Sequence, residues 1–278
     1  MRRYVFQGGT AVVTGAASGI GAALAAGLAA RGSHLVLLDR DAEGLAAVAA
    51  AARALPTGVR VAEHVADLAD PAAALAAGTA IAAEHPDTTL LINNAGIALA
   101  GRFDQCDADQ FDTVMAVNFH AVVTMTRALL PALTSHPGSH LVALSSIFGI
   151  IGPPGQTAYC ASKFAVRGFL ESLRGELAPA GVGVTCVHPG GVDTNIARNA
   201  VVGTRLPAAQ WEAGRESFSR MLTMDPADAA ATILRAVHRR RPRVLVGRDA
   251  VVLEKLARLF PVNNGRVLAA VTRRAARR

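Results

Sequence analysis

The chain has 278 residues, and 51% of them are hydrophobic, which is enough for the core of one large domain or of a domain with an appendage. Its three cysteines (Cys106, Cys160 and Cys186) are widely spaced, which argues against a CxxC metal site and a disulfide framework and indicates buried thiols in a reducing compartment. No apolar segment follows Arg2 and Arg3, and no run in the sequence is long enough to span a membrane. We therefore expect a cytoplasmic protein.

The formal net charge of +7 is distributed unevenly. Residues 1–234 hold 15 basic and 19 acidic residues, whereas residues 235–278 hold 13 basic and 2 acidic residues, a net charge of +11. We expect a solvated or subunit-contacting basic tail, with peripheral contact to an anionic membrane as the less favoured alternative. Nucleic-acid binding is not expected, because no recognition motif and no interleaved aromatic residues accompany the arginines.

Short apolar segments alternate with helical segments along the chain. Strands are predicted at residues 10–14, 34–39, 59–63, 88–92, 140–146, 183–188 and 243–246, and helices at about 21–31, 41–55, 71–84, 107–133, 156–177, 225–239 and 249–260. This alternation predicts an α/β fold: a Rossmann-type, doubly wound parallel sheet of about seven strands with helices on both faces. The predicted domain covers residues 1–247, and a helical basic extension covers residues 248–278.

The loop Thr14-Gly-Ala-Ala-Ser-Gly-Ile-Gly21 joins the first predicted strand to a helix. Glycines allow the backbone to turn tightly and to approach a diphosphate, and the helix N-terminus supplies free N–H groups. In this strand–loop–helix context we expect a nucleotide to bind the residues of this loop, namely Gly15, Ser18, Gly19, Ile20 and Gly21.

Two acidic residues follow the next two strands, at the edge where a doubly wound sheet binds its ligand. Asp39 lies 18 residues beyond Gly21, where a carboxylate accepts hydrogen bonds from a ribose diol and repels a 2′-phosphate, which favours NAD over NADP. Arg40 leaves NADP open, since a guanidinium can hold a phosphate, and a helix N-cap or a turn acid is the alternative role for Asp39. Asp67 and Leu68 are expected to read an adenine, with a turn acid as the alternative for Asp67.

Tyr159 and Lys163 stand at i and i+4 of a predicted helix and so share one face. A nearby ammonium favours the phenolate and lowers the pKa of a tyrosine, which then exchanges protons with an alcohol or carbonyl near neutral pH. Ser146 closes a predicted strand and could hold the same substrate oxygen. The alternative is that Tyr159 and Lys163 are an ordinary pair of exposed helical residues, and the presence of the glycine loop makes this alternative less favoured. Asn118 lies inside a predicted helix, where asparagine is unfavourable, so either a buried polar role or a surface position is open.

Taken together and in order, these motifs resemble the short-chain dehydrogenase/reductase family over about residues 7–247. The resemblance rests on the glycine loop, Asp67, Asn93-Asn-Ala-Gly96, Asn118, Ser146, Tyr159-x-x-x-Lys163 and Pro189-Gly-x-Val-x-Thr194. It implies that Tyr159 is the general acid/base, that Ser146 positions the substrate oxygen, and that Lys163 lowers the pKa of the tyrosine and holds the nicotinamide ribose.

The resemblance also implies further roles. Asn118 would position a water in a proton relay, and the cofactor would be lined by Asn94, Ala95, Gly96, Pro189, Gly190, Val192 and Thr194. Family members commonly have asparagine at the position of His188, for which a packed or backbone-bonded role is expected. The helices at 107–133 and 156–177 would form a homo-dimer or homo-tetramer.

Residues 194–224 are expected to cover the substrate as a lid. They include Trp211, Phe218, Met221, Leu222 and Met224, which indicates a substrate with apolar bulk unless the lid packs on its own core. The sequence thus predicts an oxidoreductase that transfers a hydride between NAD(H) and a secondary alcohol or ketone. The alternatives are an NADP(H)-dependent carbonyl reductase and a catalytically silent, nucleotide-sensing scaffold on the same fold.

Overall fold

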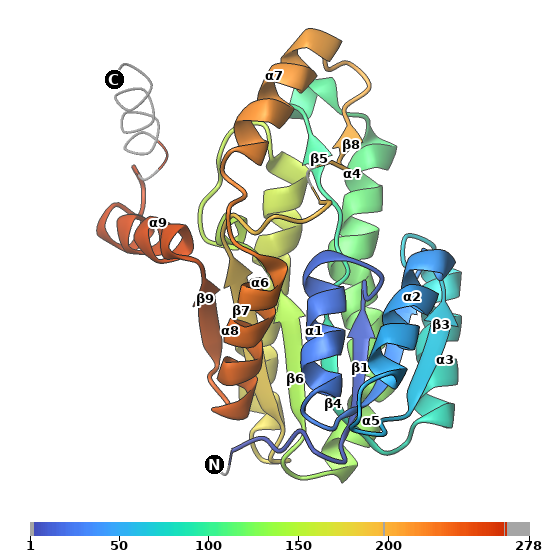
Figure 1. Cartoon of the computed structure of the whole chain (residues 1–278). Coiled ribbons are helices and arrows are strands. Elements are labelled where there is room, and N and C mark those ends of the chain that lie inside the picture. The colour runs from blue at the N-terminus through green and yellow to red at the C-terminus, as the bar shows by residue number, and fades with distance from the viewer. Residues whose placement is uncertain (1–2, 197, 264, 266–278) are drawn as a thin grey trace.

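A seven-stranded parallel sheet forms the centre of the computed structural model, which describes residues 3–196, 198–263 and 265 (Figure 1). The strand order is β3-β2-β1-β4-β6-β7-β9, which confirms the predicted doubly wound α/β fold. The strands of this sheet are β1 (Thr10–Thr14), β2 (His34–Asp39), β3 (Val61–Val65), β4 (Thr88–Asn93), β6 (His140–Leu144), β7 (Gly183–Pro189) and β9 (Arg243–Val246).

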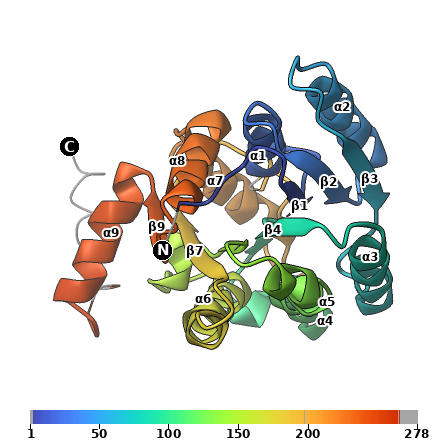
Figure 2. The ribbon, with the colours of Figure 1, turned by 90° about the horizontal axis from the view of Figure 1, so that it is seen from below.

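Helices cover both faces of the sheet. The α-helices of the described residues are α1 (Gly19–Ala29), α2 (Ala42–Arg53), α3 (Pro71–Glu84), α4 (Ala108–Met115), α5 (Ala121–Ser135), α6 (Thr157–Leu177), α7 (Ala208–Ser219), α8 (Pro226–His238) and α9 (Arg248–Leu259). Figure 2 shows α1, α2 and α8 on one side of the sheet and α3, α5 and α6 on the other, with α9 at the edge beside β9. This arrangement places the carboxyl ends of all seven strands at one rim.

Successive side chains along each strand point to opposite faces of the sheet, which produces two separate apolar cores. Val13 and Leu37 pack on the side of α1 and α8, whereas their neighbours Val12 and Val36 pack on the side of α5. Successive side chains of a strand point to opposite faces, so a strand that is buried on both faces must be apolar throughout. This explains why the central strands appear in the sequence as continuous apolar runs.

The predicted third strand lies two residues too early. The structure places β3 at Val61–Val65, because its pairing with β2 runs from Leu35 opposite Val61 to Asp39 opposite Val65. β3 is an edge strand, and Val65 is 60% exposed, so its apolar pattern is weaker than that of the central strands. The register is therefore set by the neighbouring strand rather than by local composition.

Three elements within or near the expected lid were not predicted. They are β5 (Leu99–Ala100) and β8 (Val201–Val202), which form a separate parallel pair, and the helix α7. The two strands are only two residues long and pair across a large separation in sequence, so no local pattern indicates them. Figure 1 shows this pair and α7 above the carboxyl rim of the main sheet.

The helix expected at 107–133 is continuous from α4 to α5 but includes a π-helical segment at Ala116–His120. The whole run, Ala108–Ser135, is long and apolar enough to cross a membrane by length and composition, with a mean hydropathy of 1.3 in its best window. The expectation that no such run exists was therefore wrong. In the fold, Met125 and Leu129 of this run are fully buried in the core against the sheet, which is the position of a core helix.

The described part of the C-terminal extension is anchored at the edge of the sheet. Glu254 of α9 is 6% exposed and forms ion pairs with Arg243 of β9, at 3.2 Å, and with Arg258. Ala250 of the same helix packs with Ile147 and Ile151, in the segment that follows β6. α9 therefore supports the loop after β6. The rest of the expected basic tail, residues 266–278, lies outside the described residues.

Candidate active site

The glycine loop between β1 and α1 is fixed in place by the loop that follows β4. Gly15 and Gly19 have φ angles of +65° and +53°, which favour glycine. The Asn94 side-chain amide donates to the carbonyls of Thr14 (3.0 Å) and Gly15 (2.9 Å), and the Thr14 hydroxyl accepts from the backbone N–H groups of Asn94 and Ala95. Two predicted cofactor-binding segments thus form one rigid unit.

Close backbone packing explains why position 21 is a glycine. A Cβ atom at this position would lie 1.9 Å from the Gly15 carbonyl oxygen, so α1 approaches the loop as only glycine permits. Ser18, at the N-cap of α1, makes no side-chain capping hydrogen bond. The first turn of α1, which contains Ile20, is therefore open to an anionic group such as a diphosphate. The methyl group of Thr194 lies 3.1 Å from the Cβ position of Gly19 and brings the loop after β7 against this turn.

Asp39 supports the glycine loop rather than capping a helix. Its carboxylate accepts from the backbone N–H of Ala17 at 2.9 Å and of Asp41 at 3.1 Å, and it is Asp41 that caps α2. The alternative reading of Asp39 as an N-cap is therefore wrong, whereas its contact to Asp41, two residues further on, is that of a turn acid. A carboxylate has about four lone-pair sites, so acceptor capacity remains for a ribose diol.

Arg40 and Asp67 face each other beside Asp39. The Arg40 guanidinium lies 3.7 Å from the Asp67 carboxylate, and both side chains are largely exposed. The other Asp67 oxygen accepts from the backbone N–H of Ala69, as a turn acid does, while Leu68 is buried in the core. Arg40 therefore already has an acidic partner in this structure.

Asn118 is fully buried in the π-helical segment, so the alternative of a surface asparagine is wrong. Its side-chain oxygen accepts from the Ile97 N–H at 2.8 Å, and its amide donates to the Ile97 carbonyl and to the Ser162 hydroxyl. A π-helical turn inserts one residue into a helix and often occurs at functional sites. Here it accompanies an asparagine that joins the loop after β4 to α6.

Gly96 marks the place where these segments meet. A Cβ atom there would lie 3.2 Å from the Lys163 ammonium and 3.3 Å from the Asn118 side-chain oxygen. The absence of a side chain at Gly96 therefore leaves Lys163 and Asn118 facing the same small space at the carboxyl rim.

Ser146, Tyr159 and Lys163 converge at the end of β6 and the start of α6. The Ser146 hydroxyl accepts from the Phe148 N–H, and a hydrogen bond links Ser146 to the Tyr159 phenol. The Lys163 ammonium donates to the Leu144 carbonyl at 2.9 Å and lies 5.6 Å from the centre of the Tyr159 ring. Lys163 is 3% exposed, so the alternative of an exposed helical pair is wrong.

The ionisation of this group differs from the sequence-based expectation. Burial raises the pKa of Tyr159 to about 12, and the hydrogen bond from Ser146 only partly opposes this effect. Burial also lowers the pKa of Lys163 to about 8. The ammonium points to the Leu144 carbonyl and to the face of the ring, so it does not lower the pKa of the phenol in this state. A lower tyrosine pKa requires a further positive charge or hydrogen bond at the site.

The loop after β7 is held by a residue that sequence analysis missed. The Asp249 carboxylate, at the start of α9, accepts from the Gly191 N–H at 2.7 Å and fills the space beside Gly190. Pro189 ends β7, and Val192 is buried and bridges to Met224 of the lid. Asp249 lies far along the chain in the basic extension, so no motif or spacing links it to this loop.

His188 is bound to the backbone, as expected. Its Nδ1 lies 2.9 Å from the Ser146 carbonyl oxygen, and its side chain is completely buried. Burial lowers the pKa of His188 to about 4, so the ring is neutral near pH 7. It therefore fixes the backbone at Ser146 without adding a charge.

The expected lid is attached to the rim at its base and has little core of its own. Arg205 forms an ion pair with Asp107 at 2.8 Å and donates to the carbonyls of Asp104 and Cys106. No residue of α7 is buried, Trp211 and Phe218 are half-buried, and Met221 is 57% exposed. The alternative that this segment packs on its own core has no support in α7.

Comparison with known proteins agrees with this geometry. The family model described as short chain dehydrogenase matches residues 9–203, which include the glycine loop and the Ser146–Tyr159–Lys163 group. The chain therefore belongs to the short-chain dehydrogenase/reductase family of oxidoreductases.

Relatives extend this similarity beyond the family model. The chain is 41% identical over 268 residues, 95% of both chains, to a Mycobacterium tuberculosis protein described as the oxidoreductase SadH. It resembles a Burkholderia phymatum short-chain dehydrogenase/reductase solved with NAD (TM-score 0.83, 29% identity, 92% of this chain and 95% of the other). It also resembles a Sphingobium yanoikuyae short-chain dehydrogenase solved with NADPH (TM-score 0.76, 30% identity, 95% of both chains).

The packing at Gly21 leads to a prediction about stability. Gly21→Ala should lower the free energy of unfolding by about 1–3 kcal/mol, because the new methyl group meets the Gly15 carbonyl and the backbone must shift. Gly168→Ala is the matched control: this glycine also lies inside a helix, but its Cβ position is open. Alanine there should raise stability by about 0.5–1 kcal/mol. Urea unfolding of both variants tests this, and a neutral Gly21→Ala would contradict the packing argument.

Proposed function

We propose that this protein transfers a hydride between NAD(H) and a secondary alcohol or ketone with apolar bulk. The observation that carries the proposal is the convergence of Ser146, Tyr159 and Lys163 at the carboxyl end of β6, beside the glycine loop. A nicotinamide dinucleotide would supply the hydride chemistry, and the chain would supply orientation and proton transfer. A silent scaffold has no need for such a buried acid–base group.

Each residue of the group has a distinct role in this proposal. Tyr159 exchanges a proton with the substrate oxygen, and Ser146, already hydrogen-bonded to the phenol, holds the same oxygen. Lys163 supplies positive charge beneath the ring and holds the nicotinamide ribose. Asn118 keeps the loop after β4 and α6 in place, and it can hold a water only on the side that faces Gly96, since its other contacts are to protein groups.

A nucleotide fits the chain's own residues at the other end of the rim. The open first turn of α1 would bind the diphosphate, and the loop of Asn94, Ala95 and Gly96 would line the dinucleotide. Pro189, Gly190, Val192 and Thr194 would border the nicotinamide, with Asp249 holding their loop. The two relatives solved with NAD and NADPH agree with a nicotinamide dinucleotide of either kind.

We infer NAD(H) as the preferred cofactor from Asp39. In this proposal a 2′-phosphate would bring a second negative charge beside its carboxylate, and Arg40, the cation that could offset it, faces Asp67. An NADP(H)-dependent carbonyl reductase is the rival within the class, and it requires Arg40 to leave Asp67 for the phosphate.

The preference for apolar bulk rests on the lid. α7 has no buried residue, and it carries the half-buried Trp211 and Phe218 although its Gln210 is hydrogen-bonded to Gln105. Apolar side chains that lack a core of their own gain most from covering an apolar ligand.

We infer also a cytoplasmic location and a homo-dimer or homo-tetramer. The subunits would meet through the run from α4 to α5 and through α6, on which Phe164 is 43% exposed.

The first test removes the phenol. Tyr159→Phe should lower kcat by about a hundredfold to ten-thousandfold, because positioned acid–base catalysis contributes that much. The binding of NADH, measured by fluorescence, should be retained, since the glycine loop is unchanged. Tyr4→Phe is the matched control: it removes the only other tyrosine of the chain, whose phenol bonds to Thr89 away from the rim, and should leave kcat unchanged. Near-normal turnover in Tyr159→Phe would eliminate the mechanism.

The second test concerns cofactor choice. Asp39→Asn should raise the ratio of kcat/KM for NADP(H) to that for NAD(H), because the amide removes the negative charge but can still accept from the Ala17 N–H. Asp41→Asn, at the cap of α2, should leave the ratio unchanged. Steady-state kinetics of the wild type and both variants, with each cofactor in turn, measure this ratio. A wild-type preference for NADP(H) would show that Arg40, and not Asp39, decides the choice.

A further inference from the structure

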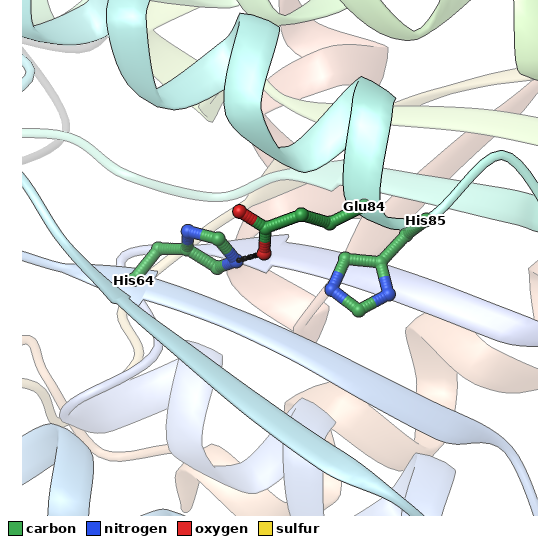
Figure 3. Close-up of side chains that lie close together, drawn as sticks. All are labelled: His64, Glu84 and His85. Carbon is green, nitrogen blue, oxygen red and sulfur yellow. Dashed lines mark ion pairs between the residues drawn. The ribbon is translucent and has the colours of Figure 1, made fainter.

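Two histidines and a glutamate meet at the outer edge of the sheet, away from the Ser146–Tyr159–Lys163 group. His64 lies on the edge strand β3, Glu84 ends α3, and His85 follows it (Figure 3). One ligand atom from each lies within 4.8 Å of the other two. No other such cluster of three is found among the residues that the structure describes.

The end of α3 explains how two consecutive residues reach the same point. His85 has φ −128° and ψ 60°, so the chain leaves the helix there. Successive residues of a continuing helix point about 100° apart, but this break lets the His85 ring return to the side of Glu84. Figure 3 shows the His85 ring beside Glu84 and facing His64, with one ring nitrogen directed toward the pair.

The contacts within the cluster are incomplete without a further group. His64 Nε2 lies 3.6 Å from a Glu84 carboxylate oxygen, a long contact for an ion pair. His85 Nε2 is buried and has no hydrogen-bond partner among the described residues. The two rings are 6.1 Å apart and nearly perpendicular, at 83°, so their contact is an edge contact rather than a stack. A buried ring nitrogen without a partner is costly, and a cation would satisfy it.

The His64 side chain is 16% exposed, so it is shielded from solvent but not closed off. The carboxylate of Glu84 is largely exposed, so an ion and its water can reach the cluster from solvent.

We propose that His64, Glu84 and His85 form a binding site for a divalent transition-metal ion of the zinc type. Two imidazoles and one carboxylate are a ligand set that Zn²⁺ accepts with water in the fourth position. Hard cations such as Mg²⁺ prefer sites made of oxygen atoms, so they do not fit this set. The site is independent of the proposed hydride transfer, because none of its residues belongs to the proposed active site.

A metal ion at this location would connect two elements of the fold. It would join the edge strand β3 to the far end of α3, and thereby close the segment between them, which contains Asp67. His64 also precedes Val65, the residue opposite Asp39 in the sheet. The site therefore clamps the sheet edge that carries the two acidic residues at the expected adenosine end.

The experiment is a Zn²⁺ titration of the full chain after removal of metal by a chelator. Calorimetry should show one Zn²⁺ per chain, and Zn²⁺ should raise the melting temperature. His64→Ala and His85→Ala should each weaken binding at least about tenfold, since even indirect contacts to a metal contribute about that much. The double variant should lose the shift in melting temperature, with its fold checked by circular dichroism.

Matched controls separate this site from adventitious binding. His120→Ala removes an exposed histidine outside the cluster and should leave Zn²⁺ affinity and the melting shift unchanged. Co²⁺ offers a second readout, because its visible absorption in a tetrahedral site should disappear in His64→Ala and His85→Ala. No Zn²⁺ binding by the wild type, or equal affinity in wild type and both cluster variants, would overturn the proposal.

Discussion

The buried ammonium of Lys163 is the constraint on which the rest of the site depends. A cation that is 3% exposed is costly unless it is bound by oxygen atoms, and the Leu144 carbonyl at the end of β6 supplies one. The neighbouring Ser145 hydroxyl donates to the carbonyl of Lys163 itself, which ties α6 to the same strand end. The Tyr159 ring, one helical turn earlier, is thereby held above the ammonium. The lysine thus determines where the phenol lies, and burial determines its pKa.

The sequence predicts those parts of the fold that local pattern and spacing encode. Six of the seven strands of the main sheet begin at the predicted residue, because strands buried on both faces are apolar throughout. The glycine loop, Asn94 and Tyr159-x-x-x-Lys163 were recognised from local sequence too, because each requires a particular residue type at a fixed distance along the chain. The edge strand β3 was misplaced, since only its pairing with β2 fixes its register.

Features that depend on tertiary contact could not be predicted. Asp249 approaches Gly191 only because α9 packs at the sheet edge beside β9, and the two residues lie 58 positions apart. The pairing of β5 with β8 and the incomplete contacts of His85 arise in the same way. The pKa of Tyr159 belongs to this group too. Helical spacing indicated a nearby ammonium, but it gave no measure of the burial that raises the pKa to about 12.

The central claim is that Tyr159 becomes a usable acid–base group only when a further positive charge joins Lys163. The most direct measurement is a tyrosinate absorbance titration in the Tyr4→Phe background, where Tyr159 is the one remaining tyrosine. Without cofactor, Tyr159 should stay protonated at pH 10, where an ordinary tyrosine is about half ionised. Saturating NAD⁺ should move its midpoint downward. An unchanged midpoint on adding NAD⁺ would contradict the account.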